Sequence, residues 1–249
     1  MMDERIYFDQ FGGKRVAVAE TRAAGSRRVI VMAHGFKGSK IGPSRYFVDL
    51  SRAAAGRGLS TFRFDQPGSG DSERSFEDSS FDTWIAAIEH FARRFIDDGC
   101  RVALLGSSMG GTASLIAAER LGSLSAVALW SAGPTLDAED APPPEGEWME
   151  EEGQRVRWDF WREAAAVDFL GAYRSLQVPC MMIFGTEDEY IPVASARTVE
   201  AARKDGDEIR VIDGLPHSAW PEPFRSVLLA DTLKFMERVL TERGGNSRR

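Results

Sequence analysis

The chain has few cysteines and no long apolar run, and each lack excludes a class of protein. Its two cysteines, Cys100 and Cys180, both flank apolar strand-like runs, which is typical of inert core thiols and not of a disulfide framework or a redox site. Its longest apolar stretches, such as residues 29–33 and 102–105, are far shorter than the ~20 residues that cross a bilayer. The cysteines therefore suggest no metal or redox site, and we expect no membrane-spanning segment; the mechanism inferred below needs no metal or organic cofactor.

Basic residues are outnumbered by acidic ones, 31 to 38, which gives a formal net charge of −7. A nucleic acid backbone would gain nothing from the overall field of such a protein. The first residues, Met1 to Arg5, are not followed by the apolar core of a secretory signal. We expect a cytoplasmic protein with neither a nucleic acid nor a membrane as its partner, and the oligomeric state stays open.

The composition that remains is that of a globular protein, with 249 residues of which 43% are hydrophobic and 28% charged. Short apolar runs that favour buried strands alternate with longer amphipathic segments. The strand-like runs cover residues 29–33, 60–64, 102–105, 126–131 and 181–185. This alternation predicts an α/β protein with a mainly parallel, doubly wound sheet in a single domain, residues 1–249.

Two other segments extend this prediction. Residues 6–9 and 14–20 flank Gly12 and Gly13, which predicts an antiparallel hairpin at the edge of the sheet. Residues 81–98 carry apolar side chains at helical spacing, which predicts an amphipathic helix that packs on the sheet.

The alternation stops between residues 136 and 171. Three consecutive prolines, Pro142 to Pro144, precede an acidic stretch and a helix-like segment over residues 155–169. A segment of this length is too short for a core of its own. We therefore predict a small helical cap, or lid, inserted in the main domain over residues 136–171. The Arg- and Gly-rich end of the chain, residues 243–249, is expected to be a disordered tail.

A Gly-x-Ser-x-Gly pentapeptide, residues 106–110, follows a predicted buried strand and precedes a small-residue helix start. A serine in a strained strand-to-helix turn leaves little room for a Cβ two positions away on either side, and Gly106 and Gly110 provide that room. The alternative is a glycine-rich turn with an exposed serine. The strand before it and the helix after it favour Ser108 as a nucleophile.

A serine hydroxyl needs a base that removes its proton. The chain contains three histidines. His34 directly follows a strand, and His90 lies on the polar side of the predicted helix over residues 81–98. His217 lies in a loop late in the chain, after the last strand. Since the base should be carried by such a loop, we predict that His217 is the base.

The base needs an acid that orients it, and three acids compete just past the strand over residues 181–185. Asp188 is favoured because a nucleophilic serine in a strand-to-helix turn requires an acid in the turn after another strand. Residues 191–192 close the turn that follows residues 181–185. Glu187 is the alternative. The chain order is then nucleophile Ser108, acid Asp188 and base His217.

The oxyanion of a tetrahedral intermediate needs preorganised N–H donors. The two expected donors are the amide that follows the nucleophile, at Met109, and an amide in the loop after an early strand, at Phe36. Met109 also begins a helix, whose N-terminus favours an anion. Gly35 and Gly38 allow the loop to fold close to the nucleophile, although a merely flexible turn would have the same composition.

These motifs together resemble the α/β-hydrolase superfamily, and the resemblance covers nearly all of the chain outside the insertion and the tail. It rests on His34-Gly35-Phe36, on residues 65–72 and 106–111, and on Asp188 and His217. Residues 65–72 are similar to the family's Asp-x-x-Gly-x-Gly-x-Ser loop, with proline where the family often has Arg or Asn. The resemblance implies an α/β-hydrolase fold and a nucleophile, acid and base in the chain order found here.

Within the superfamily, the compact core and the single small insertion resemble feruloyl or cinnamoyl esterases and serine-aminopeptidase-like lipases. The serine at position 108 argues against relatives that resemble haloalkane dehalogenases and epoxide hydrolases, which need a carboxylate there. It also argues against dienelactone hydrolases, which use cysteine.

The predicted cap is rich in aromatic residues and contains Trp148, Trp158, Trp161, Phe160 and Phe169. Packing is the simpler interpretation, because an amphipathic helix buries one face on the core. Above a nucleophile the same rings can also form the wall of a pocket for an acyl or aryl group. We therefore predict that Trp158 and Trp161 bind substrate.

The sequence thus predicts a serine carboxylesterase that forms an acyl-enzyme on small neutral esters with an aromatic or short-to-medium acyl group. The three catalytic residues do not encode the leaving group, so a thioesterase, an amidase or peptidase, and an acyltransferase are alternatives. A small-molecule sensor with little turnover is an alternative of another class. Covalent labelling by a fluorophosphonate separates an active enzyme from such a sensor.

Overall fold

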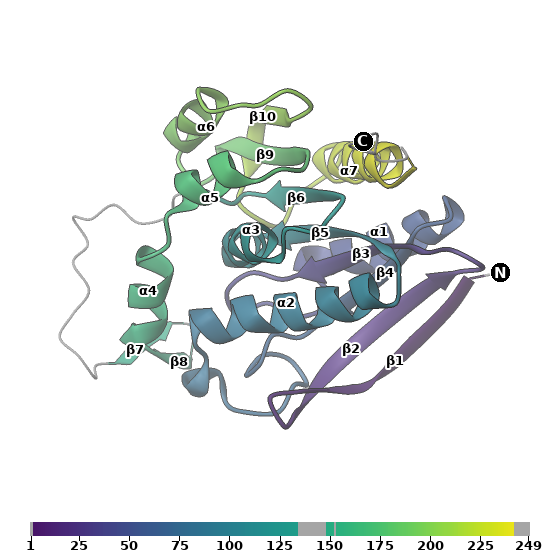
Figure 1. Cartoon of the computed structure of the whole chain (residues 1–249). Coiled ribbons are helices and arrows are strands. Elements are labelled where there is room, and N and C mark those ends of the chain that lie inside the picture. The colour runs from purple at the N-terminus through teal and green to yellow at the C-terminus, as the bar shows by residue number, and fades with distance from the viewer. Residues whose placement is uncertain (1, 134–147, 152, 242–249) are drawn as a thin grey trace.

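An eight-stranded sheet forms the centre of the computed structural model, which describes residues 2–133, 148–151 and 153–241. The strand order is β1-β2-β4-β3-β5-β6-β9-β10 (Figure 1). These strands are β1 (Met2–Phe11), β2 (Lys14–Ala23), β3 (Arg28–Ala33), β4 (Ser60–Phe64), β5 (Arg101–Ser107), β6 (Ala126–Trp130), β9 (Cys180–Glu187) and β10 (Glu208–Pro216). Strand β2 is antiparallel to both its neighbours and all other pairs are parallel, which confirms the predicted sheet and its N-terminal hairpin.

Helices cover both faces of this sheet. They are α1 (Tyr46–Gly56), α2 (Phe81–Asp97), α3 (Met109–Leu121), α4 (Trp158–Ala165), α5 (Phe169–Ser175), α6 (Val193–Glu200) and α7 (Phe224–Thr241), with short 3-10 helices η1 (Pro43–Arg45) and η2 (Phe76–Asp78). In the described part of the chain, every helix is too short or too polar to cross a membrane.

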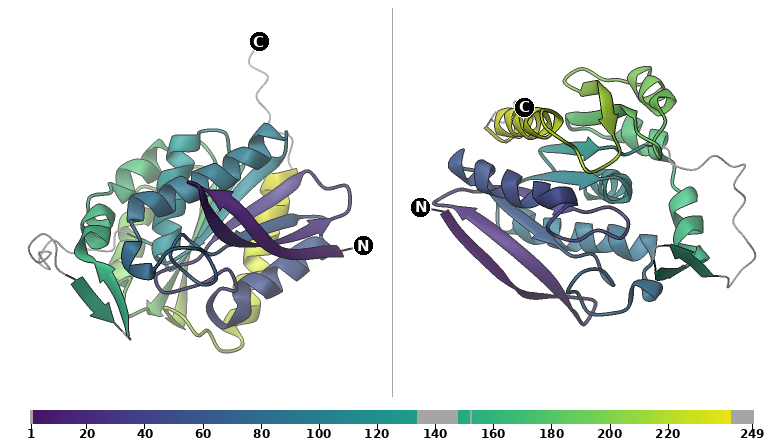
Figure 2. Two further views of the ribbon diagram at one scale, coloured as in Figure 1. Left: turned by 90° about the horizontal axis from the view of Figure 1, so that it is seen from below. Right: turned by 180° about the vertical axis from the view of Figure 1, so that it is seen from behind.

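The period of two along the buried strands divides the core into two layers. In β3, Val29, Val31 and Ala33 pack in one hydrophobic cluster with side chains of α2 and α3. The alternate residues Ile30 and Met32 pack in a second cluster with side chains of α1 and α7. Figure 1 and Figure 2 show these two helix layers from opposite sides. Because both faces of the strands are covered, each strand is apolar throughout, which is why the sequence signal was strong.

The predicted helix over residues 81–98 corresponds to α2. It begins at Phe81 because the Ser80 side chain accepts a hydrogen bond from the N–H of Thr83, at 3.3 Å. Its apolar face, which includes Trp84 and Phe91, is buried against the sheet. The amphipathic pattern of the sequence therefore identified the helix and its buried face.

The carboxyl ends of the parallel strands meet at one edge of the sheet, and this edge carries the polar residues singled out by the sequence. The residues that directly follow β3, β4, β5, β9 and β10 are His34, Asp65, Ser108, Asp188 and His217. Ligands of open α/β sheets bind at this edge.

The segment over residues 136–171 is predicted to be a helical cap, but its first described residues form a β-hairpin. Residues 154–157 form strand β8 (Gln154–Arg157), which pairs antiparallel with β7 (Trp148–Glu151). Val156 is buried while its neighbours are exposed, and Arg155 and Arg157 both lie over the Trp148 ring. This alternation has the period of a strand, so the helix prediction over residues 155–169 is wrong for its first turn.

The helical part of that segment is also divided. Helix α4 ends at Ala165, and α5 begins at Phe169 after Asp168, whose side chain accepts from the N–H of Gly171 at 2.8 Å. In Figure 1, α4 and the β7–β8 hairpin lie beyond the carboxyl ends of the strands. Residues 136–147 and 152 of the predicted cap, and the predicted tail 243–249, lie outside the described residues.

Candidate active site

Ser108 occupies a sharp turn between β5 and α3. Its backbone has φ 54° and ψ −130°, a region that non-glycine residues rarely adopt. Such a conformation costs about 1–3 kcal/mol and persists only where the surroundings enforce it. The turn puts the Ser108 side chain at the edge of the sheet, directly before the N-terminus of α3.

The two glycines of the pentapeptide allow this turn. A Cβ on Gly106 would lie 2.4 Å from the carbonyl oxygen of Gly110, and a Cβ on Gly110 would lie 2.1 Å from that of His34. Both distances are far inside van der Waals contact, and both obstacles are backbone atoms. The first turn of α3 therefore packs against the end of β3 in a way that only glycine permits.

His217 joins Ser108 to Asp188 by hydrogen bonds. Its Nε2 lies 2.9 Å from Oγ of Ser108, and its Nδ1 lies 2.8 and 2.9 Å from the two carboxylate oxygens of Asp188. Because a carboxylate only accepts, Nδ1 carries the proton and donates it to Asp188. Nε2 is then free to accept the Ser108 hydroxyl proton. The three residues that the sequence singled out thus form one hydrogen-bonded row.

Asp188, and not Glu187, is the acid in this row. Glu187 is the last residue of β9 and its side chain is exposed, whereas the Asp188 carboxylate is fully buried. Burial alone would raise the pKa of the Asp188 carboxyl. Hydrogen bonds from His217 and from the N–H groups of Ile191 and Tyr190 outweigh burial and hold that pKa below its usual value.

Tyr190 is a member of this site that the sequence did not single out. Its N–H donates to Asp188 at 3.0 Å, and its ring packs edge-on against the His217 ring, with centroids 4.9 Å apart. The side chain is still 62% exposed. An exposed aromatic ring beside the imidazole gives one side of the site an apolar wall, and a single tyrosine in an acidic turn carries no sequence signal for that role.

The loop after β3, residues 34–40, lies directly beside Ser108. A Cβ on Gly35 would lie 2.8 Å from the Cβ of Ser108. No backbone carbonyl of the described residues outside helices and strands accepts from the N–H of Phe36. The N–H of Met109 is the first of α3 and has no intrahelical acceptor. Among the described residues, both predicted oxyanion donors thus have N–H groups without a backbone partner, Met109 directly after the serine and Phe36 in the loop beside it.

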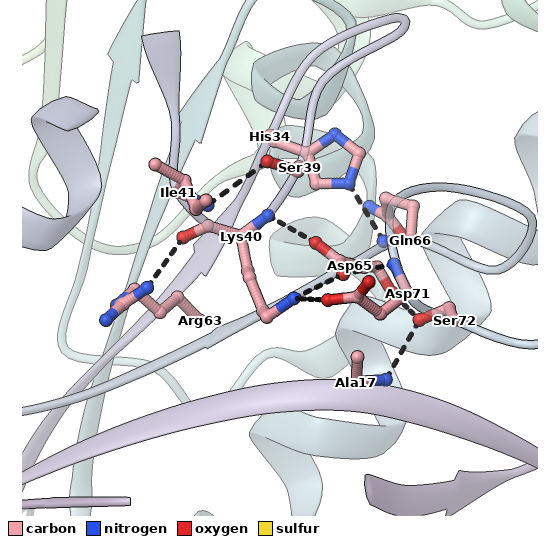
Figure 3. Close-up of polar contacts among 10 residues, drawn as sticks. All are labelled: Ala17, His34, Ser39, Lys40, Ile41, Arg63, Asp65, Gln66, Asp71 and Ser72. Atoms are coloured by element: carbon pink, nitrogen blue, oxygen red, sulfur yellow. Dashed lines mark hydrogen bonds and ion pairs between the residues drawn. The ribbon is translucent and has the colours of Figure 1, made fainter. Parts of the chain in front are cut away.

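The other two histidines are apart from this row. The His34 ring is completely buried, and its Nε2 accepts from the N–H of Gln66 at 2.9 Å (Figure 3). Nδ1 therefore donates to the carbonyl of Gly35 at 2.8 Å. Burial lowers the pKa of His34 below its usual value, which keeps the ring neutral. His90 is exposed on α2, where its ring packs against Phe11.

An aromatic cluster covers the 34–40 loop. The Phe36 ring has three aromatic neighbours: Trp161 at 4.9 Å, Phe76 at 5.1 Å and Phe160 at 5.5 Å between centroids. Phe160 and Trp161 belong to α4. Trp158, the other predicted substrate-binding residue, is half-buried at the start of α4, and in the described chain its ring does not belong to this cluster. The structure therefore brings Trp161 to the loop and leaves Trp158 apart from it.

The described residues contain no cluster of three or more His, Cys, Asp or Glu side chains arranged to hold a metal ion. Both cysteines have free thiols, and Cys180 is buried in β9. The chemistry available at this edge of the sheet is that of a hydroxyl, an imidazole, a carboxylate and nearby N–H groups.

Comparison with known proteins places this fold in a family. Residues 30–231 match the model of the alpha/beta hydrolase family, so the chain belongs to that family. No curated protein matches the chain significantly in sequence.

Solved structures show the same fold at low sequence identity. Est1E from Butyrivibrio proteoclasticus, solved with ferulic acid bound, is 17% identical with a TM-score of 0.80, over 95% of this chain and 100% of that chain. The alpha/beta hydrolase GrgF from Penicillium sp. sh18 is 16% identical with a TM-score of 0.80, over 97% and 100%. The monoacylglycerol lipase of Paleococcus ferrophilus is 16% identical with a TM-score of 0.73, over 90% and 99%.

The close approach at Gly110 can be tested by one methyl group. We expect Gly110→Ala to lower the free energy of unfolding by at least about 1–3 kcal/mol, because its Cβ meets a backbone carbonyl that cannot rotate away. Gly56→Ala, where a Cβ meets nothing within 4 Å, is the matched control and should be neutral or slightly stabilising. Urea unfolding measures both, and equal effects of the two substitutions would contradict the packing argument.

The environment of Asp188 predicts a pH dependence of stability. A carboxyl whose pKa is lower in the folded than in the unfolded state stabilises the fold above the unfolded pKa, about 3.9, and this contribution disappears as the pH falls through the folded value. The wild type should therefore lose its stability advantage over Asp188→Asn as the pH falls below about 4. Urea unfolding from pH 3 to 6 measures this difference, and a difference independent of pH would refute the assignment.

Proposed function

We propose that the protein is a serine-dependent carboxylic ester hydrolase that works through an acyl-enzyme. The observation that carries this proposal is the hydrogen-bonded row Ser108–His217–Asp188, with Ser108 in a strained turn at the N-terminus of a helix. This arrangement of nucleophile, base and orienting acid is the one that activates a serine hydroxyl for attack on a carbonyl carbon.

In the first half of the reaction, Ser108 Oγ attacks the ester carbonyl carbon while His217 Nε2 takes the hydroxyl proton. The positive charge that develops on the imidazole lies beside the buried Asp188 carboxylate, which stabilises it and fixes the ring orientation. The carbonyl oxygen becomes an oxyanion. The N–H groups of Phe36 and Met109 would hold it, and the positive end of the α3 dipole favours the same charge.

In the second half, collapse of the tetrahedral intermediate breaks the bond to the leaving alcohol, and His217 gives that oxygen the proton it took from Ser108. The acyl group then remains on Ser108. A water molecule attacks it with His217 as base, and the proton returns to Ser108 Oγ as the carboxylic acid leaves. Each proton therefore passes through Nε2, the ring nitrogen that faces the serine.

The substrate class follows from the apolar surroundings of the site. The Phe36 ring of the 34–40 loop packs against the rings of Phe76 and Trp161. The Tyr190 ring packs against His217. Such walls favour neutral esters with an aromatic or short-to-medium acyl group. The bound ferulic acid in the Est1E structure is an aromatic acid, which supports the same choice. In this proposal the segment over residues 136–171 is the cap of the site.

A substrate panel tests the proposed activity. We expect the wild type to hydrolyse p-nitrophenyl esters, and Ser108→Ala to remain folded while kcat falls by about 10³-fold or more, because the hydroxyl that bonds His217 Nε2 is lost. Thioesters, amides and acyl transfer to an alcohol complete the panel. Turnover that survives in Ser108→Ala would contradict the mechanism, and preferential cleavage of thioesters or amides would replace the ester assignment.

The role of the cap aromatics has its own test. Trp161→Ala removes the ring that contacts Phe36, so we expect the ratio of kcat/KM between aromatic and short aliphatic acyl esters to change by about 10-fold, the effect of a lost apolar pocket contact. Trp158→Ala measures the second predicted residue. Trp148→Ala is the control, because the contacts of that ring are with Arg155 and Arg157 of the hairpin. Unchanged acyl preference in both Trp161→Ala and Trp158→Ala would exclude the proposed pocket.

A further inference from the structure

Lys40 is one of five lysines in the chain, and its ammonium group is buried near the candidate site. Its side chain is 7% exposed and that of Asp65 is fully buried. Nζ of Lys40 lies 2.7 Å from Oδ2 of Asp65 and 2.8 Å from Oδ2 of Asp71 (Figure 3). This ion pair is not part of the hydrogen-bonded row Ser108–His217–Asp188.

Stability alone does not account for such a pair. Two charges lose their hydration on burial, and a buried ion pair is often no more stabilising than apolar side chains of the same volume. In some proteins a buried polar or ionic group is retained because it fixes one geometry of the chain. The element next to Lys40 whose geometry matters is the 34–40 loop, which begins at His34, passes Ser108 and ends at Lys40.

The backbone of Lys40 is held as firmly as its side chain. Its N–H donates to Oδ1 of Asp65 at 2.5 Å, and its carbonyl oxygen accepts from Nη1 of Arg63 at 3.2 Å. Arg63 is itself buried in β4 and donates to Glu4 of β1 at 2.8 Å. Figure 3 shows the bonds from Arg63 and Asp65, near the end of β4, to Lys40. Residue 40 is thus fixed through its N–H, its carbonyl and its ammonium group.

The start of the loop is attached to the same place. The N–H of Gln66, the residue after Asp65, donates to Nε2 of His34 at 2.9 Å. Between the two attachment points, the N–H of Gly38 donates to the carbonyl of Gly35 at 3.0 Å and closes a turn around Phe36. Two consecutive residues at the end of β4 therefore hold both ends of the loop that carries the Phe36 N–H.

We propose that Lys40 is a positioning residue whose ion pair with Asp65 holds the 34–40 loop so that the Phe36 N–H points at the oxyanion. Lys40 acts through the loop and touches no reacting atom. The inference rests on the proposed function, since it assigns Phe36 to the oxyanion hole. An N–H donor displaced by a fraction of an ångström stabilises the transition state less, while ground-state binding barely changes. We therefore expect loss of the ion pair to lower kcat and to leave KM nearly unchanged.

Substitution of Lys40 by methionine tests this directly. Lys40→Met keeps the length of the side chain and removes the ammonium group, which leaves the buried Asp65 carboxylate with backbone N–H donors alone. Lys40→Met/Asp65→Asn removes the uncompensated charge as well. Lys204→Met is the matched control, because Nζ of Lys204 is also held internally, by the carbonyls of Tyr173 and Leu176 at 2.5 and 3.0 Å, in a part of the fold away from Ser108.

Three readouts separate positioning from stability. The first is the second-order rate at which a fluorophosphonate labels Ser108, since that reaction also develops charge on an oxygen in the oxyanion hole. The second is the inhibition constant of a trifluoromethyl ketone ester analogue, which forms a tetrahedral adduct, against that of the product acid. The third is kcat and KM for a p-nitrophenyl ester, with the melting temperature recorded for every variant.

We expect Lys40→Met to label Ser108 about 10-fold more slowly, to bind the ketone more weakly by the same factor and to lower kcat with little change in KM. Lys40→Met/Asp65→Asn should have a higher melting temperature than Lys40→Met, but its labelling rate should stay below that of the wild type. Lys204→Met should lose melting temperature and keep the wild-type labelling rate.

A labelling rate within twofold of the wild type in Lys40→Met would overturn the inference, and so would a full return of that rate in the double variant. If Lys40→Met does not fold, the labelling rate of the double variant decides: a rate within twofold of the wild type would overturn the inference. The proposed function is judged separately: a wild type that is labelled at Ser108 but hydrolyses no ester would refute the ester hydrolase assignment, while the labelling rates still measure the effect of Lys40.

Discussion

The close contact between the first turn of α3 and the end of β3 is the constraint on which the rest of the site depends. Because Gly110 has no side chain, its backbone approaches the carbonyl of His34, two residues after the strained backbone of Ser108. The same contact brings the 34–40 loop against the serine. One packing requirement therefore places Ser108 directly before the N-terminus of α3 and beside the 34–40 loop. The proposed mechanism needs that contact, because it requires the Ser108 hydroxyl to lie beside His217.

Two histidines of this edge differ in chemistry because their partners differ. His34 is fully buried, and its ring nitrogens are both engaged by backbone groups, so it is neutral and connects two loops. His217 has a carboxylate on Nδ1 and a hydroxyl on Nε2, which are the two partners that the proposed base requires. His34 thus bonds backbone groups of two loops, whereas His217 bonds the side chains of the proposed nucleophile and acid.

The sequence predicted most of the fold because the strands are apolar on both faces and α2 is amphipathic over its whole length. It also singled out Ser108, Asp188 and His217, since each directly follows a strand or lies just beyond one at the same edge of the sheet. It failed at β8, where Arg155 and Arg157 alternate around Val156 in a stretch too short to distinguish a strand from a helix. The buried position of Lys40 and the contact of Tyr190 with His217 left no mark in the sequence, because each depends on loops brought together only by the fold.

The central claim is that Ser108 carries an acyl group during turnover, and rapid-quench mass spectrometry of the protein mixed with a p-nitrophenyl ester tests it most directly. If the account is correct, a burst of p-nitrophenol equal to the enzyme concentration accompanies a mass increase equal to one acyl group, and peptide mapping assigns that group to Ser108. A burst without an acylated peptide, or an acyl group on another residue, would contradict it.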